Sequence, residues 1–148
     1  MNKRRTVAAL ALAGIFVALY LTLTRVGLIG GGALVCAVGS CEVVNASRWA
    51  TFVGLPVAVW GLGYYLVTFA VAVVSLQERF GDSMQVSRAL VFLGATGFLF
   101  SAWLTYLELF VIRAICQWCV VSALLATGIF VASLLDYREL QRLAKTQV

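Results

Sequence analysis

Four uncharged, apolar runs of about 20 residues constrain this chain more than any other feature. The runs cover residues 6–24, 53–76, 89–110 and 114–135, and only Glu108 interrupts the third, near its end. A helix rises ~1.5 Å per residue, so about 20 residues cross the ~30 Å hydrocarbon core of a bilayer. In lipid, only a helix satisfies the backbone groups of an open chain. We therefore expect an all-α integral membrane protein, a single domain over residues 1–148 with four transmembrane helices in one bundle.

The composition agrees with a lipid environment. Hydrophobic residues make up 63% of the chain and charged residues 11%, against roughly 45–50% and about 25% in soluble domains. The net charge of +5 does not indicate nucleic acid, because the basic residues lie at the ends of the apolar runs. The chain has no histidine, which excludes serine-type triads and imidazole metal ligands. Its four cysteines are therefore its most reactive side chains.

The basic residues also predict the orientation. Four spans place both termini and the 77–88 loop on one side, with eight Lys and Arg residues (Lys3, Arg4, Arg5, Arg79, Arg88, Arg138, Arg142 and Lys145). The other side has three (Arg25, Arg48 and Arg113). The positive-inside rule makes the first side cytoplasmic, so the chain is predicted N-in and C-in in the inner or plasma membrane. The first run is longer than the apolar region of a signal peptide, and we expect a retained helix.

The cysteines form two close pairs, and both lie on or near the predicted outer side, where disulfides persist. Cys116 and Cys119 form a C-x-x-C motif in the first turn of the fourth helix. Residues three apart share a helix face, and a helix N-terminus lowers the pKa of a thiol. Cys119 is expected about 4.5 Å deeper than Cys116. This geometry suits electron transfer between thiols at the water side and a lipid-soluble acceptor.

The second pair, Cys36 and Cys41, lies in a glycine-rich loop, which predicts a mobile dithiol that exchanges with the fixed pair. Residues 42–49 interleave polar and apolar side chains, and we expect a short amphipathic helix there that caps the bundle. Two alternatives stay open from the residues alone: static structural disulfides in a non-catalytic small membrane protein, and a zinc site with four cysteine ligands.

Several glycine, proline, tryptophan and glutamate residues in or beside the apolar runs also have predicted roles. The Gly54-Leu55-Pro56 step suits the beginning of the second helix near Val53. Trp60 and Trp118 are candidates for lining a ring-shaped pocket, and Glu108 is either a proton donor or a side chain that reaches water or Arg113. Four glycines, Gly61, Gly63, Gly94 and Gly97, are expected where helices pack closely.

The chain resembles the vitamin K epoxide reductase family. The resemblance spans the four apolar runs, the two loop cysteines with a downstream serine, and the C-x-x-C motif of the fourth helix. Residues 41–49 are similar to the family's stretch from the second loop cysteine to its serine, here Ser47. Residues 106–116 are similar to its approach to the active-site pair. The sequence departs from vertebrate members at Ala123, where they have tyrosine, and its loop cysteines are closely spaced for the family.

The resemblance implies a role for each matching residue. Cys119 contacts a quinone and Cys116 exchanges with the loop, where Cys41 is the shuttle thiol and Cys36 meets a soluble partner. Ser47 lies near the pocket. The quinone, of menaquinone or ubiquinone type, is a substrate and not a tightly bound cofactor. The partner is expected to be a separate thioredoxin-like protein, because no such domain is fused. No metal and no nucleic acid is expected.

Overall fold

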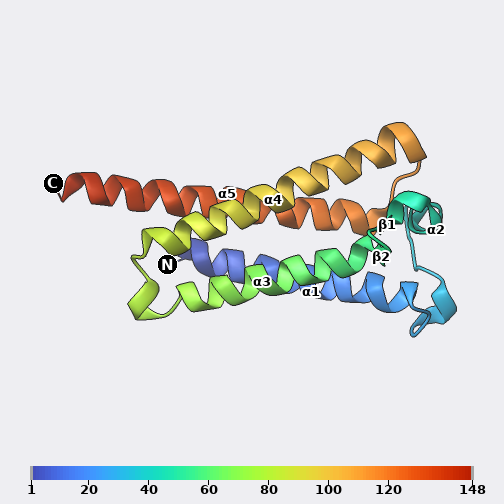
Figure 1. Cartoon of the computed structure of the whole chain (residues 1–148), viewed down its shortest axis with the longest axis horizontal. Helices are drawn as coiled ribbons and strands as arrows, with labels where there is room; N and C mark the ends of the chain where they lie inside the picture. Colours follow the sequence, from blue (N-terminus) through green and yellow to red (C-terminus); the bar gives the residue numbers. More distant parts are fainter. Residues whose placement is uncertain (1, 148) are drawn as a thin grey trace.

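Four long helices form the molecule. A computed structural model describes residues 2–147, and within them the long helices are α1 (Asn2–Arg25), α3 (Val57–Ser75), α4 (Met84–Tyr106) and α5 (Gln117–Thr146) (Figure 1). A π-helix, η4 (Leu107–Ile112), continues α4. Each of the four helices, with η4 counted in the third, is long and apolar enough to cross a membrane. The predicted all-α membrane bundle of four helices is confirmed.

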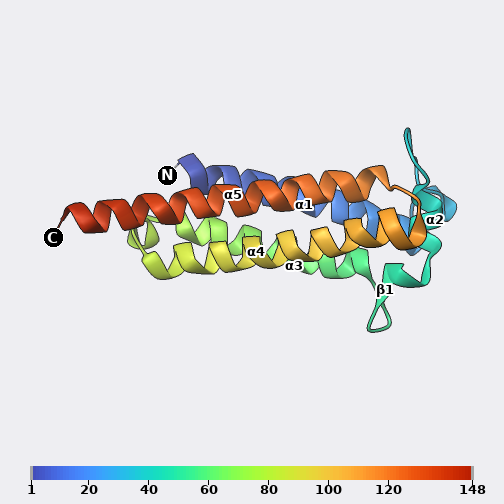
Figure 2. The same cartoon turned by 90° about the horizontal axis from the view of Figure 1, so that it is seen from above.

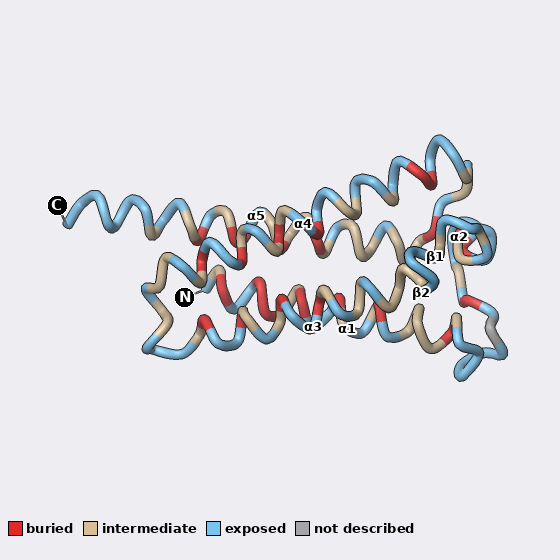
Figure 3. The backbone as a smooth tube through the Cα atoms, viewed as in Figure 1, coloured by how far each residue is buried: buried red, intermediate tan, exposed pale blue. Residues whose placement is uncertain are grey.

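The helices pack side by side along the long axis of the molecule. Helix α1 packs against α3 and α5, and α5 also packs against α4 (Figures 1 and 2). The core between them is built largely from small or branched side chains: Val7, Ala8, Ala11, Ala18, Tyr65, Ala72, Leu90, Ile129 and Ala132. Large apolar side chains such as Phe16, Phe92 and Leu124 point outward. Exposed segments therefore run along the outside of every helix, where a bilayer supplies the apolar contact (Figure 3).

Glycines permit the closest helix approach at two of the four expected positions. A Cβ atom at Gly94 of α4 would lie 2.8 Å from the Cα atom of Phe130 in α5, and one at Gly97 would collide with the Tyr64 ring of α3. Gly61 and Gly63 have nothing within 4 Å of such an atom. The predicted close packing of helices is confirmed at Gly94 and Gly97 of α4, and it is wrong at Gly61 and Gly63 of α3.

The short elements gather at the two ends of the bundle. After α1 come η1 (Gly30–Gly32), α2 (Cys41–Ala46) and η2 (Arg48–Ala50), and η3 (Glu78–Phe80) lies between α3 and α4 at the opposite end. Helix α2 sits over the end of the bundle away from the termini, as predicted for the capping helix (Figure 1). The predicted helix over 42–49 is broken at Ser47, whose extended backbone separates α2 from η2.

The second long helix begins later than predicted. Residues 51–56 form a two-stranded antiparallel hairpin, β1 (Thr51–Phe52) with β2 (Leu55–Pro56). Val53 and Gly54 make its turn with φ values of 53° and 78°, a left-handed conformation that glycine adopts without steric cost. Pro56 precedes the first turn of α3. The expected start near Val53 was therefore wrong, because the glycine serves a hairpin turn and the proline ends a strand.

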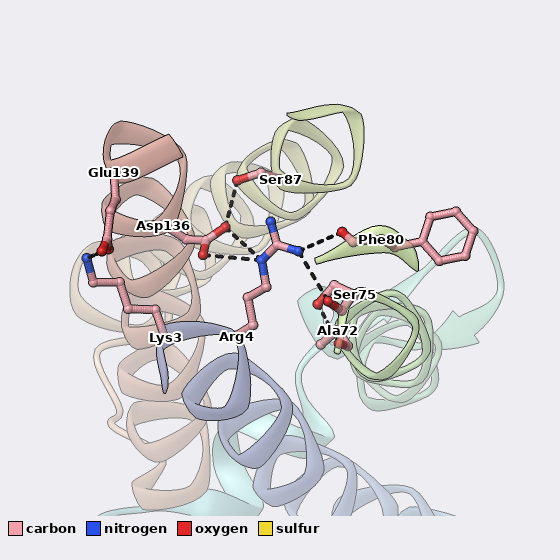
Figure 4. A network of polar contacts seen from close by, with 8 residues as sticks. All are labelled: Lys3, Arg4, Ala72, Ser75, Phe80, Ser87, Asp136 and Glu139. Atoms are coloured by element: carbon pink, nitrogen blue, oxygen red, sulfur yellow. Dashed lines mark hydrogen bonds and ion pairs between the residues drawn. The ribbon is translucent and has the colours of Figure 1, made fainter. Parts of the chain in front are cut away.

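A buried polar network holds the end of the bundle near the termini (Figure 4). Arg4 of α1 is 2% exposed, and its Nε atom donates to both carboxylate oxygens of Asp136 in α5, at 3.2 and 3.0 Å. Its Nη1 atom donates to the carbonyl oxygens of Ser75 and Phe80, and the Ser87 hydroxyl of α4 donates to Asp136 at 2.8 Å. All four long helices and η3 are thus joined through the Arg4–Asp136 pair.

Candidate redox site

The four cysteines meet at the end of the bundle that α2 covers. Cys41 and Cys116 are each 1% exposed and share a buried cluster with Leu34 and Val44, against which Cys36 and Cys119 pack. Residues separated by about 80 positions in the sequence therefore contribute sulfur atoms to one site. A thiol exchange between the pairs requires such proximity, because a thiolate must attack a sulfur directly.

The loop pair is joined covalently. Cys36 and Cys41 form a disulfide with their Cα atoms 6.2 Å apart, whereas Cys116 and Cys119 are free thiols. Cys41 is the first residue of α2 and is buried, and Cys36 lies in the preceding loop and is half-buried. The less buried sulfur is thus on the loop and the more buried one faces the second pair.

The loop that carries Cys36 is docked onto the beginning of α5. Gly39 and Cys116 form an antiparallel bridge, and the Ser40 N–H donates to the Ile115 carbonyl oxygen at 2.9 Å. Two side chains of the C-x-x-C segment complete the contact: Gln117 accepts the Val38 N–H at 3.1 Å, and the Trp118 indole donates to the Val35 carbonyl at 3.0 Å. The sequence predicted a loose backbone here, but the glycine-rich segment is held by hydrogen bonds.

Gly39 is required by this docking. Its φ is 98°, and a Cβ atom on it would collide with the Ile115 carbonyl oxygen. Only glycine combines that backbone conformation with so close an approach. The glycine between the loop cysteines therefore fits the loop to the fixed pair and does not merely loosen the chain.

The fixed pair lies at the beginning of α5. Cys116 is the N-cap residue, with extended backbone, and Cys119 lies in the first turn. A hydrogen bond from the Cys119 side chain, helped by the N–H groups of Cys119 and Trp118, lowers the pKa of Cys116 from 9.0 to about 7, although burial opposes this shift. A substantial fraction of Cys116 is therefore thiolate at neutral pH, and the thiolate is the nucleophile in disulfide exchange.

The π-helix η4 sets the approach to Cys116 and turns Glu108 inward. Arg113 follows η4 with φ 54° and ψ 36°, and residues 114–115 then connect it to Cys116 and α5 without regular secondary structure. The wider turn buries Glu108 to 5% exposure, and its carboxyl accepts the Cys116 N–H at 3.2 Å. Of the two possibilities considered for Glu108, contact with water or Arg113 is not what the structure shows. π-Helical turns are frequent at functional sites.

A cavity of about 310 Å³ opens beside the fixed pair, and Cys116, Cys119 and Glu108 line it. The rest of its wall comes mainly from α3 and α4, which diverge toward this end (Figure 1). The wall is predominantly apolar, with polar groups from Asn45, Ser47, Tyr64, Tyr65, Thr96, Ser101, Thr105 and Ser122. Such a volume and lining are typical of sites for small apolar ligands that carry a few polar groups.

The cavity contains two of the three residues predicted to contact substrate. Ser47 lines it, and the Ser47 hydroxyl donates to the Val44 carbonyl at 2.7 Å where α2 ends. Trp60 lines it too, and its indole N–H donates to the Phe52 carbonyl of the hairpin at 3.1 Å. Trp118 does not belong to the cavity wall. Its ring packs against Tyr20 with centroids 5.0 Å apart, so Trp118 braces the docked loop.

Sequence reasoning predicted only Ser47 among these polar residues of the wall and missed the other seven, including Asn45, Tyr64 and Tyr65. The Tyr65 hydroxyl bonds to Ser122 of α5, whereas the Tyr64 hydroxyl is buried without a hydrogen-bond partner. The adjacent tyrosines in an otherwise apolar span were the available signal, because a phenol in lipid needs a partner for its hydroxyl.

Comparison with known proteins identifies the family. The model of the vitamin K epoxide reductase family matches residues 5–134, which include all four cysteines and the whole cavity wall. The chain belongs to this family. Membership makes it an oxidoreductase of the membrane. Within residues 2–147, no group of three or more His, Cys, Asp or Glu side chains could hold a metal ion.

Proposed function

We propose that this member of the vitamin K epoxide reductase family couples disulfide formation in a thioredoxin-like partner to the reduction of a membrane quinone. One observation carries the proposal: a loop disulfide, a dithiol and an apolar cavity converge at one end of a membrane bundle. The cavity is lined by both sulfurs of the dithiol and suits a quinone ring of menaquinone or ubiquinone type. The site would lie at the extracytoplasmic face, with both termini in the cytoplasm.

Each cysteine has a separate role in the proposed cycle. A thiolate of the reduced partner attacks Cys36, and the Cys36–Cys41 bond breaks. The freed Cys41 thiolate attacks Cys116 of an oxidised Cys116–Cys119 pair and releases the Cys119 thiolate, which takes up one of the two protons that the partner's thiols lose. The second thiol of the partner then attacks its mixed disulfide with Cys36, so the partner leaves oxidised and the Cys36 thiolate is released. This thiolate attacks Cys41, which re-forms the Cys36–Cys41 bond and releases the Cys116 thiolate. The reduced Cys116 and Cys119 finally give two electrons to the quinone and form their disulfide again.

The burial of the cysteines supports this order. Cys36 is the more accessible sulfur of its pair, Cys41 packs in one cluster with Cys116, and Cys119 lines the cavity. Electrons thus have a continuous route from the outside to the cavity. Ser47 and Trp60 would contact the bound quinone from the capping segment and from α3.

The test compares two single variants in purified, membrane-reconstituted protein, with quinone reduction followed by absorbance. Cys119→Ala is expected to abolish quinone reduction with any thiol donor, because Cys116 alone cannot form the disulfide that supplies the two electrons. Cys36→Ala is expected to block turnover with a protein dithiol while a small dithiol still supports it. Undiminished turnover of Cys36→Ala with the protein donor would refute the shuttle assignment.

Thiol alkylation separates this proposal from static disulfides. In reduced wild-type protein, addition of quinone is expected to protect Cys116 and Cys119 from alkylation as their disulfide forms. A non-catalytic protein with structural disulfides would show the same labelling with and without quinone.

A further inference from the structure

Glu108 is an acid in an unusual position. It lies near the end of the candidate span Met84–Ile112, is 5% exposed, and borders the cavity next to both free thiols. Burial of a carboxyl group in a membrane protein is costly, and such groups commonly serve function. Glu108 is the one carboxyl in the cavity wall among the described residues.

Glu108 is not held by an ion pair. The two ion pairs among residues 2–147 join Lys3 to Glu139 and Arg4 to Asp136, both at the other end of the bundle. The Glu108 carboxyl is instead directed at the redox pair: it accepts the Cys116 N–H at 3.2 Å, and Glu108 lines the cavity together with Cys119. A structural salt bridge therefore does not explain this acid.

The proposed reaction needs a proton carrier at this place. Reduction of a quinone to a quinol takes up two protons with two electrons, and oxidation of two thiols releases them. Histidine, the most frequent proton carrier of enzymes, is absent from the chain. The hydroxyl groups of the wall bind their protons far more tightly than a carboxyl group does. Glu108 is thus the side chain in the cavity best suited to accept and then give up a proton.

We propose that Glu108 is a catalytic residue that transfers a proton from the Cys119 thiol to the bound quinone. The inference rests on the proposed function. As the bond between the Cys116 and Cys119 sulfurs forms, two electrons pass to the quinone. The carboxyl group gives its proton to a quinone oxygen and takes the proton that leaves Cys119. Glu108 is therefore protonated again at the end of the step. The second proton of the quinol comes from water and replaces the one that Cys116 lost on becoming a thiolate.

The test is Glu108→Gln, which keeps an oxygen to accept the Cys116 N–H but cannot carry a proton. In reconstituted protein we expect kcat for quinone reduction to fall by at least ~100-fold, with the KM for quinone changed little. Reduction of the Cys116–Cys119 disulfide by dithiothreitol is expected to proceed at the wild-type rate. The matched control is Glu78→Gln, which removes an exposed acid of η3 and is expected to behave as wild type.

Chemical rescue covers the case in which the glutamine variant does not fold. Glu108→Ala opens a small space, and added formate is expected to restore quinone reduction in proportion to its concentration without affecting disulfide exchange. Wild-type kcat in folded Glu108→Gln would overturn the inference. So would an equal loss of disulfide exchange and quinone reduction, because Glu108 would then only position Cys116. A wild-type protein that reduces no quinone would instead refute the proposed function itself.

Discussion

Cys116 and Cys119 are three residues apart, yet their surroundings differ. Cys116 precedes α5 and receives a hydrogen bond from the Cys119 side chain, which is the main reason that its pKa lies near 7. Cys119 lies inside the helix and lines the cavity. Both sulfurs line the cavity, and in the proposed cycle Cys116 is the one that exchanges with the loop and Cys119 the one that faces the quinone.

The pKa of Cys116 should respond to the loss of its partner. In a Cys36→Ser/Cys41→Ser background, Cys119→Ala removes the hydrogen-bond donor, so the pKa of Cys116 is expected to rise from about 7 to its ordinary value of 9.0 or above. At pH 7 the thiolate fraction would fall from about half to about 1%. A titration followed by the ultraviolet absorbance of the thiolate measures the change.

Cys119→Ser is the matched control for this titration, because a hydroxyl group still donates a hydrogen bond. We expect it to retain most of the lowering, and the rate of attack by Cys116 on a disulfide to fall about tenfold per pH unit below its pKa. Identical titration curves for the alanine and serine variants would show that the Cys119 side chain does not set the pKa of Cys116.

At the scale of elements, the sequence predicted the four long helices and the helix that carries the C-x-x-C motif. The four helices follow from their uncharged lengths, and the position of Cys119 in the first turn of α5 follows from the C-x-x-C spacing. The hairpin at Val53 and the π-helix at Glu108 were not predicted. Each is a local change of backbone conformation that tertiary contacts decide, and neither alters the apolar pattern.

The candidate site was predictable in its residues but less so in its contacts. The four cysteines, Ser47 and Trp60 were named from the sequence, whereas the docking of Gly39 on Cys116 joins segments far apart in the chain. Long-range pairing of this kind leaves no periodicity in either segment. The same reason hid the partner of Arg4, which the orientation argument had counted only among the basic residues of one side.

The Arg4–Asp136 pair gives a prediction about how the helices are held together. Arg4→Met leaves the Asp136 carboxylate buried without a cation, and loss of one partner of a buried pair costs roughly 3–5 kcal/mol. We expect a clear fall in the thermal unfolding midpoint in detergent, followed by tryptophan fluorescence. The folded fraction should still carry out disulfide exchange, because the network lies at the opposite end from the cysteines (Figures 1 and 4).

Lys3→Met is the control, since the Lys3–Glu139 pair is exposed and exposed pairs contribute little. The double variant Arg4→Met/Asp136→Leu should recover part of the lost stability, because both buried charges are then absent. If Arg4→Met and Lys3→Met unfolded at the same temperature, the buried network would not hold the helices together.

At the scale of the whole molecule, most of the basic residues lie at one end of the bundle and the cysteines at the other. Both termini and η3 lie at one end, and α2, the hairpin and all four cysteines lie at the other (Figures 1 and 2). Burial of Arg4 removes one of the eight basic residues from the surface of the first end, and the remaining seven still exceed the three of the other. The positive-inside rule therefore continues to predict cytoplasmic termini and an extracytoplasmic redox site.

Labelling of single cysteines in intact cells tests this orientation. In a parent with all four cysteines changed to serine, Val53→Cys places a thiol on the exposed turn of the hairpin, and Asp82→Cys places one in the loop between α3 and α4. A membrane-impermeant maleimide is expected to label Val53→Cys in intact cells and Asp82→Cys only after permeabilisation. The reverse pattern would place the cysteines in the reducing cytosol, where the Cys36–Cys41 disulfide would not persist. The direction of the proposed reaction, toward disulfide formation in an outside partner, would then be wrong even if quinone reduction itself were observed.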